Sequence, residues 1–210
     1  MPAVVTPVGQ CVIVQGVGWD TYTCLLADFA DSSGTRIAYN QGTLEIMAPS
    51  FKHEQAADLL SDIVKAVAEA QALDVVPAGS TTFKREDVER GFEPDASFYV
   101  QHAADIRGLS TVDLAVDPPP DVIIEIDLTH PSLDKFPIYA ALGVPEVWRH
   151  DGTQIHMYRR LDEAYTEVPS SAVLLGVTTA SLTQMVHLGL ELPRQVWIGR
   201  VRDWVESLAA

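Results

Sequence analysis

The chain has few cysteines and no long apolar run. Cys11 and Cys24 are the only cysteines in 210 residues, and their spacing matches no metal-binding pattern. We expect both to be ordinary thiols in a reducing cytoplasm. No apolar run reaches the roughly 18 residues that cross a bilayer, and the start, Met1 to Val5, lacks the basic region of a signal peptide. A cytoplasmic protein without a membrane span is the prediction.

Basic residues are also scarce. The chain has 14 Lys and Arg against 29 Asp and Glu, which gives a formal net charge of -15. Such a protein repels nucleic acid at long range, so tight non-specific DNA binding is disfavoured. Acidic clusters suit Mg²⁺ or Mn²⁺, which prefer oxygen ligands. Any positive surface must be local, and the candidates are Lys84-Arg85 with Arg90, and Arg159-Arg160.

Several common catalytic motifs are missing. Zinc is a weaker alternative because the chain has no HExxH and no paired cysteines, which leaves Asp127, His130 and His53 as potential ligands. No glycine loop that binds phosphate is present. Ser80 and Ser132 lack the surroundings of a serine nucleophile.

The hydrophobic pattern predicts one mixed α/β domain with a central sheet, spanning 1–210. Apolar residues recur at three- and four-residue steps over about 51–71, which indicates a long amphipathic helix that Ser50 can cap. A turn at Asn40-Gln41-Gly42 predicts a hairpin between its flanking strands. Gly143 is a typical stop for a helix over 136–142.

The remaining elements complete this outline. Residues 1–18 are predicted to form an N-terminal arm or edge strand, and 171–210 a C-terminal helical extension. A further helix is expected over Trp19 to Phe29. Strands are expected near 12–16, 36–40, 43–48, 73–77, 80–84, 95–100, 122–128, 146–150, 154–159 and 164–168, the last three as a meander.

Acidic side chains occur in two apolar stretches that are typical of buried strands. Asp95 precedes Phe98-Tyr99-Val100, and Glu125 follows Val122-Ile123-Ile124. Charged side chains are rarely buried unless they pair with another charge or bind a metal. Strand alternation places Glu125 and Asp127 on one face, where two carboxylates can share a cation. The alternative is that Asp95 caps a turn and Asp127 ends its strand.

A lysine follows the second of these strands after a short loop. Lys135 lies at the start of the next predicted helix, where a cation opposes the helix dipole. A lysine there can orient an attacking water or stabilise a phosphoryl transition state. The alternative is a solvated lysine paired with Asp134 or Glu125. A lysine in a first helical turn adds little stability, so we expect removal of Lys135 to leave folding nearly intact. Lys84, whose strand leads toward Asp95, is the next candidate.

Two polar residues flank the turn before the long helix. Glu45 alternates with apolar Leu44 and Ile46, and His53 opens the helix. Either side chain is a candidate to support the acidic site, as a metal ligand itself or by contacting a metal ligand. A histidine at a helix start is also a common capping group.

Three ordered blocks together resemble the Uma family of restriction-type endonucleases, formerly a domain of unknown function. The first runs from Gly42 to Ser50 (Gly-Thr-Leu-Glu-Ile-Met-Ala-Pro-Ser), followed by His53-Glu54. The second runs from Gly91 to Val100, and the third from Glu125 through Lys135 to Trp148. The resemblance covers roughly residues 20–170.

This resemblance implies the PD-(D/E)XK nuclease fold, a restriction endonuclease-like mixed β-sheet flanked by helices. It also implies a site that binds Mg²⁺ or Mn²⁺. Carried over to this chain, Asp95 and Glu125 are metal ligands, together with the backbone carbonyl of Ile126. Asp127 stands where the family pattern of the fold has lysine, and it is a further candidate ligand. Lys135 then supplies the amine from the adjacent helix.

Our interpretation is a Mg²⁺-dependent endonuclease that hydrolyses DNA through Asp95, Glu125 and Lys135. The alternatives are a non-catalytic module of the same fold that binds protein or nucleic acid, and a hydrolase of small phosphoesters. Cutting both strands of a duplex favours a two-fold homodimer. The C-terminal helix offers an apolar surface for that contact, made of Trp197, Ile198, Val201, Trp204 and Val205. The alternative is that its tryptophans pack on the chain itself.

Overall fold

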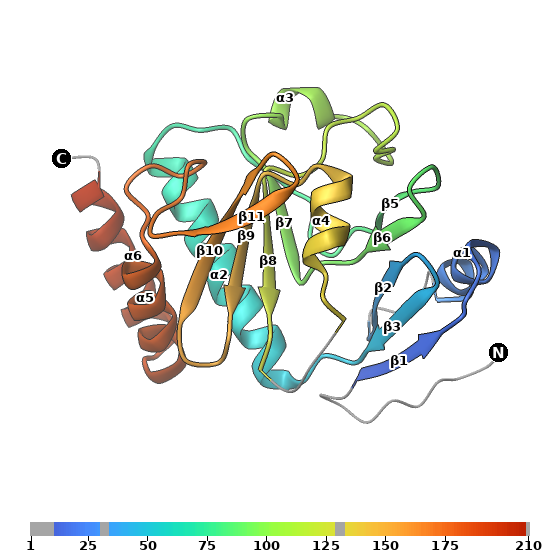
Figure 1. Cartoon of the computed structure of the whole chain (residues 1–210). Helices are drawn as coiled ribbons and strands as arrows, with labels where there is room; N and C mark the ends of the chain where they lie inside the picture. The colour runs from blue at the N-terminus through green and yellow to red at the C-terminus, as the bar shows by residue number, and fades with distance from the viewer. Residues whose placement is uncertain (1–10, 30–33, 129–132, 209–210) are drawn as a thin grey trace.

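The computed structural model describes residues 11–29, 34–128 and 133–208, and it contains two β-sheets rather than one central sheet (Figure 1). Sheet A has the order β1-β3-β2-β6-β5, and sheet B has the order β11-β10-β9-β8-β7-β4. The strands of sheet A are β1 (Cys11–Gln15), β2 (Arg36–Asn40), β3 (Thr43–Met47), β5 (Phe83–Arg85) and β6 (Arg90–Phe92). The strands of sheet B are β4 (Val76–Pro77), β7 (Ala96–Tyr99), β8 (Val122–Ile126), β9 (Glu146–His150), β10 (Ile155–Leu161) and β11 (Ala164–Val168).

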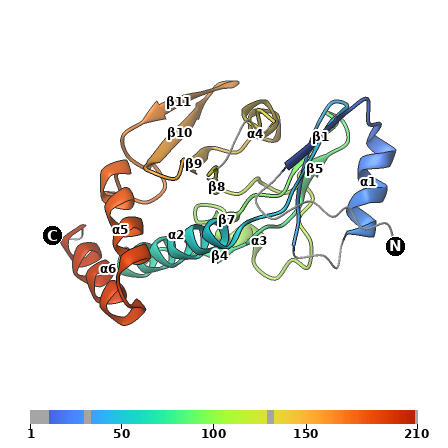
Figure 2. The ribbon, with the colours of Figure 1, turned by 90° about the horizontal axis from the view of Figure 1, so that it is seen from below.

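Helices cover both faces of sheet B, as Figure 2 shows from below. Helices α2, α5 and α6 lie on one face and α4 lies on the other, while α1 packs against sheet A. The helices are α1 (Trp19–Asp28), α2 (Phe51–Ala70), α3 (Ala103–Ile106), α4 (Phe136–Leu142), α5 (Thr179–Glu191) and α6 (Arg194–Leu208). Among the described residues, no helix is both long and apolar enough to cross a bilayer.

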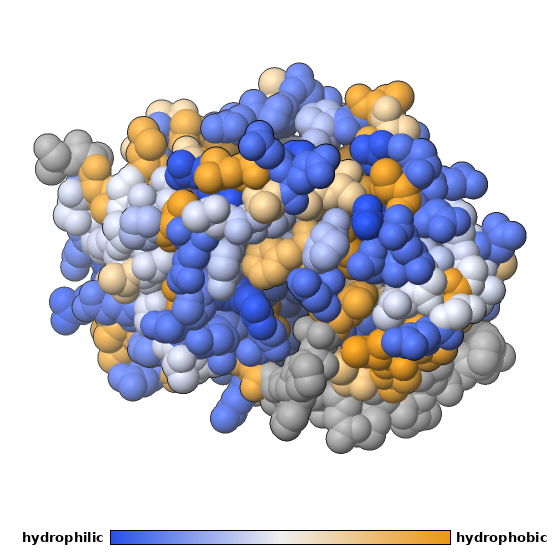
Figure 3. Space-filling view, in the orientation of Figure 1, coloured by the Kyte–Doolittle hydropathy of each residue, from blue (hydrophilic) through white to orange (hydrophobic). Residues whose placement is uncertain are grey.

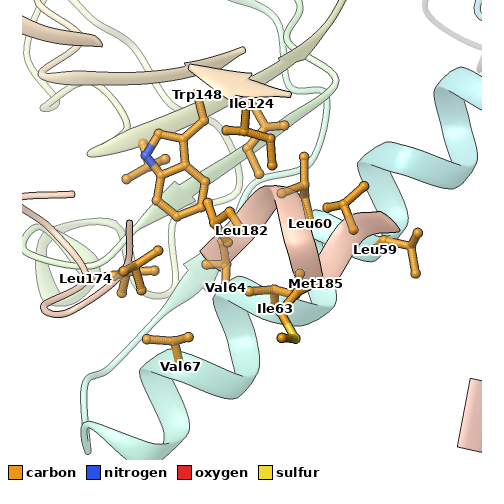
Figure 4. Packing of buried hydrophobic residues seen from close by; sticks show 14 of the residues in the cluster. Leu59, Leu60, Ile63, Val64, Val67, Ile124, Trp148, Leu174, Leu182 and Met185 are labelled. Carbon is orange, nitrogen blue, oxygen red and sulfur yellow. The ribbon is translucent and has the colours of Figure 1, made fainter. Parts of the chain in front are cut away.

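The largest core lies between α2 and sheet B (Figure 4). Ser50 caps α2 by accepting a hydrogen bond from the backbone N–H of His53. The apolar stripe of the helix then buries completely, with Leu60, Ile63 and Val64 at 0 % exposure. This confirms the predicted amphipathic helix, whose first turn is thereby fixed beside sheet B.

The second core lies between α4 and the opposite face of sheet B. Strands β8 and β9 are parallel, and α4 lies between them in the chain, as a parallel connection requires. Gly143 ends α4 in the left-handed conformation, with φ of 84°. The bounds of α4 agree with the prediction. The start of α4 stands near the end of β8 that carries Glu125, because Lys135 contacts Glu125 there.

The C-terminal helix does not present the apolar surface predicted for a dimer. Trp197 is 1 % exposed, and its indole N–H donates to the backbone carbonyl of Met185. Val201 and Val205 are buried as well, and Trp204 packs against the same core. The alternative was therefore correct: both tryptophans pack on the chain itself, where α6 contacts α2 and α5.

Three consecutive exposed apolar residues lie instead at the edge of sheet A. Within the described ranges, strand β1 is an outer strand that pairs with β3 alone. Val12, Ile13 and Val14 are 41 %, 44 % and 42 % exposed, and an apolar area is visible there in Figure 3. The predicted edge strand is confirmed over Cys11–Gln15, and residues 1–10 of the predicted arm lie outside the described residues.

Other predictions were less accurate. The strand expected near 73–77 is reduced to Val76–Pro77, and the one near 80–84 begins only at Phe83. Strand β6 and helix α3 were not predicted, because neither is long enough to show a period. His130 and Ser132, which were weighed as a zinc ligand and a nucleophile, lie outside the described residues.

Candidate active site

Three carboxylates and one amine meet where the two sheets adjoin. Glu45 comes from β3 of sheet A, Glu125 from β8 of sheet B, and Asp95 from the residue before β7. The ammonium Nζ of Lys135 lies 3.0 Å from Glu125 Oε2 and 3.5 Å from Glu45 Oε1. A single lysine thus pairs with one acid from each sheet.

The start of α4 places this lysine. Lys135 is the N-cap residue, and its backbone carbonyl accepts from the N–H groups of Ile138 and Tyr139 at 2.9 and 3.1 Å. Just before it, the N–H of Leu133 donates to Glu45 Oε2 at 2.6 Å. Glu45 therefore holds both the approach to the helix and its first side chain. The side chain of Lys135 is 12 % exposed, so it is not the solvated lysine of the alternative reading.

Asp95 is fixed by a backbone group and a histidine. Its Oδ2 accepts from the N–H of Ile126 at 2.8 Å and lies 2.7 Å from His53 Nε2. The other oxygen, Oδ1, is buried and accepts no hydrogen bond from the described residues, and the nearest cation atom is Arg36 Nε at 3.9 Å. A buried carboxylate oxygen without a donor is costly unless something else compensates its charge.

Glu125 has both oxygens engaged. Oε1 accepts from the hydroxyl of Tyr139 at 2.8 Å, and Oε2 accepts from Lys135. Burial raises the pKa of Glu125, while the charge of Lys135 opposes the rise and that of Asp95 adds to it. The protonation of Glu125 therefore depends on the charges of Lys135 and Asp95.

The three carboxylates in turn shift the pKa of Lys135. Burial alone would lower the pKa of Lys135, but the charges of Glu125, Glu45 and Asp95 raise it well above its ordinary value. Lys135 therefore stays protonated at neutral pH. It can donate hydrogen bonds and stabilise negative charge, but it is not a base.

The oxygen donors of this group are of the type that a hard divalent cation prefers. Three carboxylates converge, and one of their oxygens, Asp95 Oδ1, is buried without a hydrogen-bond donor among the described residues. In the described part of the chain, no three Asp, Glu, His or Cys side chains already stand in an arrangement that holds a metal ion. The ammonium of Lys135 supplies the positive charge beside Glu45 and Glu125 instead.

The other predicted site residues lie at different distances from this group. His53 joins it through Asp95, and Ile126 joins it through its backbone N–H. Asp127 pairs with Arg149 at the end of β8 and is not bound to Lys135. Lys84 is exposed on β5, which β2 and β6 separate from β3, and among the described residues it makes no hydrogen bond or ion pair with the site.

Sequence reasoning assigned no role to two residues of this group. Tyr139 stands four positions after Lys135, and this spacing puts both side chains on one face of α4, where both reach Glu125. Arg36 lies in β2 and bonds Glu54 at 3.3 Å while approaching Asp95. The helix spacing of Tyr139 was a usable signal; Arg36 had none, because its position depends on how the sheets meet.

Comparisons with known proteins agree with this geometry. A family model described as "Uma2: Putative restriction endonuclease" matches residues 19–195. A crystal structure described as that of a putative nuclease belonging to DUF820, from Anabaena variabilis, is similar with a TM-score of 0.51 at 16 % identity. The match covers 71 % of this chain and 90 % of that chain, and it supports the predicted restriction endonuclease-like α/β fold. None of the curated proteins matches the sequence.

Proposed function

Because the chain belongs to the Uma2 family of putative restriction endonucleases, we propose that it is a divalent-metal-dependent endonuclease that hydrolyses DNA phosphodiester bonds. The observation that carries this proposal is the buried group around Lys135. An ammonium lies 3.0 Å from Glu125 and 3.5 Å from Glu45, with Asp95 beside them. Acids that bind a cation and an amine that stabilises charge are the two components that metal-assisted hydrolysis of a phosphodiester needs.

Asp95 and Glu125 would hold the cation, which is Mg²⁺ or Mn²⁺ by the chemistry of the oxygen ligands. The carbonyl of Ile126 is the further ligand that the family pattern implies, and the carboxylate of Asp127 is a further candidate because strand alternation places it on the face of Glu125. When bound, such an ion polarises the phosphoryl oxygen and lowers the pKa of a coordinated water.

The chain's own residues have distinct parts. Lys135 donates a hydrogen bond that orients the attacking water and stabilises the charge of the transition state. Glu45 holds Lys135 from the opposite sheet, at 3.5 Å from its Nζ. His53 fixes Asp95 Oδ2, which leaves the buried Oδ1 as the oxygen that a cation can take.

Cleavage of a supercoiled plasmid tests this proposal. The protein is incubated with Mg²⁺ or Mn²⁺, and Glu125→Gln and Lys135→Met are compared with Lys65→Met, which alters a half-exposed lysine of α2. We expect cleavage by the wild type and by Lys65→Met, its loss on adding EDTA, and a fall of about 10² to 10³ in the two site variants. Equal cleavage by all four proteins would mean that the activity lies elsewhere.

The charge of the chain favours a second candidate, a non-catalytic nuclease-fold module. The net charge is -15, and two of the arginines proposed as a local basic surface are engaged: Arg85 pairs with Asp87, and Arg90 bonds Asn40. Such a module would bind its partner without cleaving DNA. A wild type that binds Mn²⁺ or DNA yet leaves the plasmid intact would support it.

A homodimer remains part of the proposal, since two sites are needed to cut both strands. Helix α6 cannot supply the predicted interface, because Trp197, Val201 and Val205 are buried within the chain. Light scattering measures the mass directly. A dimeric mass fits double-strand cleavage, and a monomeric mass fits nicking of one strand.

A further inference from the structure

A buried tyrosine shares the catalytic carboxylate with the lysine. The hydroxyl of Tyr139 donates to Glu125 Oε1 at 2.8 Å, and Lys135 Nζ donates to Oε2 at 3.0 Å. Both donors come from the first turns of α4, four positions apart. The two oxygens of one carboxylate are therefore held by two groups of different character.

The tyrosine is rigid where the lysine is adaptable. Tyr139 is 3 % exposed, and its ring makes edge contacts with Phe92 at 4.8 Å and Phe136 at 6.1 Å between centroids. Packing on two sides fixes the ring and hence the hydroxyl. Lys135 has a long flexible stem and contacts two carboxylates, so it can exchange partners.

We propose that Tyr139 is a positioning residue that fixes Glu125 Oε1, so that only Oε2 faces Lys135 and a divalent cation can displace the ammonium from that oxygen. This inference rests on the proposed metal-dependent function. Without the hydroxyl, the carboxylate can turn both oxygens toward Lys135. The ion pair then becomes a stronger competitor of the cation for Glu125.

Tyr165 provides a matched control for this proposal. Its hydroxyl donates to the backbone carbonyl of Val144 at 2.6 Å, and its ring contacts Phe136 at 5.2 Å. Burial raises the pKa of the Tyr165 hydroxyl, as it does the pKa of the Tyr139 hydroxyl. Tyr165→Phe thus removes a buried, hydrogen-bonded hydroxyl from the same neighbourhood without touching Glu125.

Calorimetric titration with Mn²⁺ alone tests the inference. We expect Tyr139→Phe to weaken Mn²⁺ binding about 10- to 100-fold, the usual effect of losing a group that orients a metal ligand, and Tyr165→Phe to leave it unchanged. In the Lys135→Met background the loss from Tyr139→Phe should shrink, because the competing ammonium is gone. A purely structural role would lower stability in both phenylalanine variants without this selective loss of affinity.

The outcomes separate the two proposals. If the wild type binds no Mn²⁺, the metal-dependent function fails. If the wild type binds and Tyr139→Phe binds equally well, only the role of Tyr139 fails. Should Tyr139→Phe not fold, a Mn²⁺-bound crystal structure of the wild type decides: the hydrogen bond from Tyr139 to Oε1 must persist, and its absence overturns the inference.

Discussion

The ammonium of Lys135 lies 3.0 Å from the carboxylate of Glu125, and this pair is buried between the two sheets. The side chains are 12 % and 10 % exposed, so the pair is shielded from solvent. Buried charges destabilise a protein strongly when one partner is removed, because the other is left uncompensated. The contact is thus structural in the metal-free protein, in addition to its proposed part in catalysis.

Lys135→Met should therefore destabilise the metal-free protein by about 3–5 kcal/mol, more than sequence analysis suggested for a lysine in a first helical turn. Urea unfolding measures this loss, with Lys65→Met as the control. Added Mn²⁺ should restore more stability to the Lys135→Met variant than to the wild type, since a cation can replace the ammonium. A variant as stable as Lys65→Met would show that Lys135 is not needed to balance the charges.

Asp95→Asn should weaken Mn²⁺ binding by about tenfold or more, because it removes the charge of a carboxylate whose Oδ1 accepts no hydrogen bond from the described residues. Asp121→Asn is the control. Asp121 is a buried aspartate that lies 2.6 Å from His102 Nδ1, just as Asp95 lies 2.7 Å from His53, but it lies at the opposite end of β8. Calorimetry that gave the same affinity for both variants would remove Asp95 from the metal site.

Gly91→Ala should lower the free energy of unfolding by about 1–3 kcal/mol through overpacking. A Cβ at Gly91 would clash with the hydroxyl of Tyr22, whose ring stacks on Tyr39. The double variant with Tyr22→Phe should recover part of the loss. Gly199→Ala, where a Cβ meets nothing within 4 Å, is the control for the added methyl group in urea unfolding.

Stability should also depend on the charge of His156. Hydrogen bonds to Glu167 and, after the opposing effect of burial, to Asp151 raise the pKa of His156. The stabilising contribution is therefore complete below the unfolded-state pKa of about 6.5 and is lost as pH rises through the folded-state pKa. In urea unfolding between about pH 6 and pH 8.5, His156→Gln should lose less stability than the wild type. Equal losses would contradict this assignment.

The sequence predicted the helices better than the arrangement of the sheets. The three- and four-residue steps of α2 and the stop at Gly143 depend on local rules, and both helices agree with the structure. Which strand pairs with which is decided by contacts far apart in the chain. The single predicted sheet is two sheets for that reason, with β2 joined to β6 rather than to any strand of sheet B.

The same distinction applies to side chains. Glu125 was a candidate because acids in apolar strands are unusual, and Glu45 because it flanks the turn before α2. Nothing in the sequence shows that Lys135 contacts both. Tyr139 was missed because an aromatic residue in an apolar helix is usually part of a core. The burial of Trp197 could not be predicted from the sequence, because it depends on how α5 packs against α6.

A Mn²⁺-soaked crystal tests the central claim most directly, because anomalous scattering locates the ion. The account predicts one Mn²⁺ with oxygen ligands from Asp95 and Glu125 at about 2.0–2.4 Å, and Lys135 displaced from Glu125 Oε2. An ion bound elsewhere, with Lys135 still bridging Glu45 and Glu125, would contradict it.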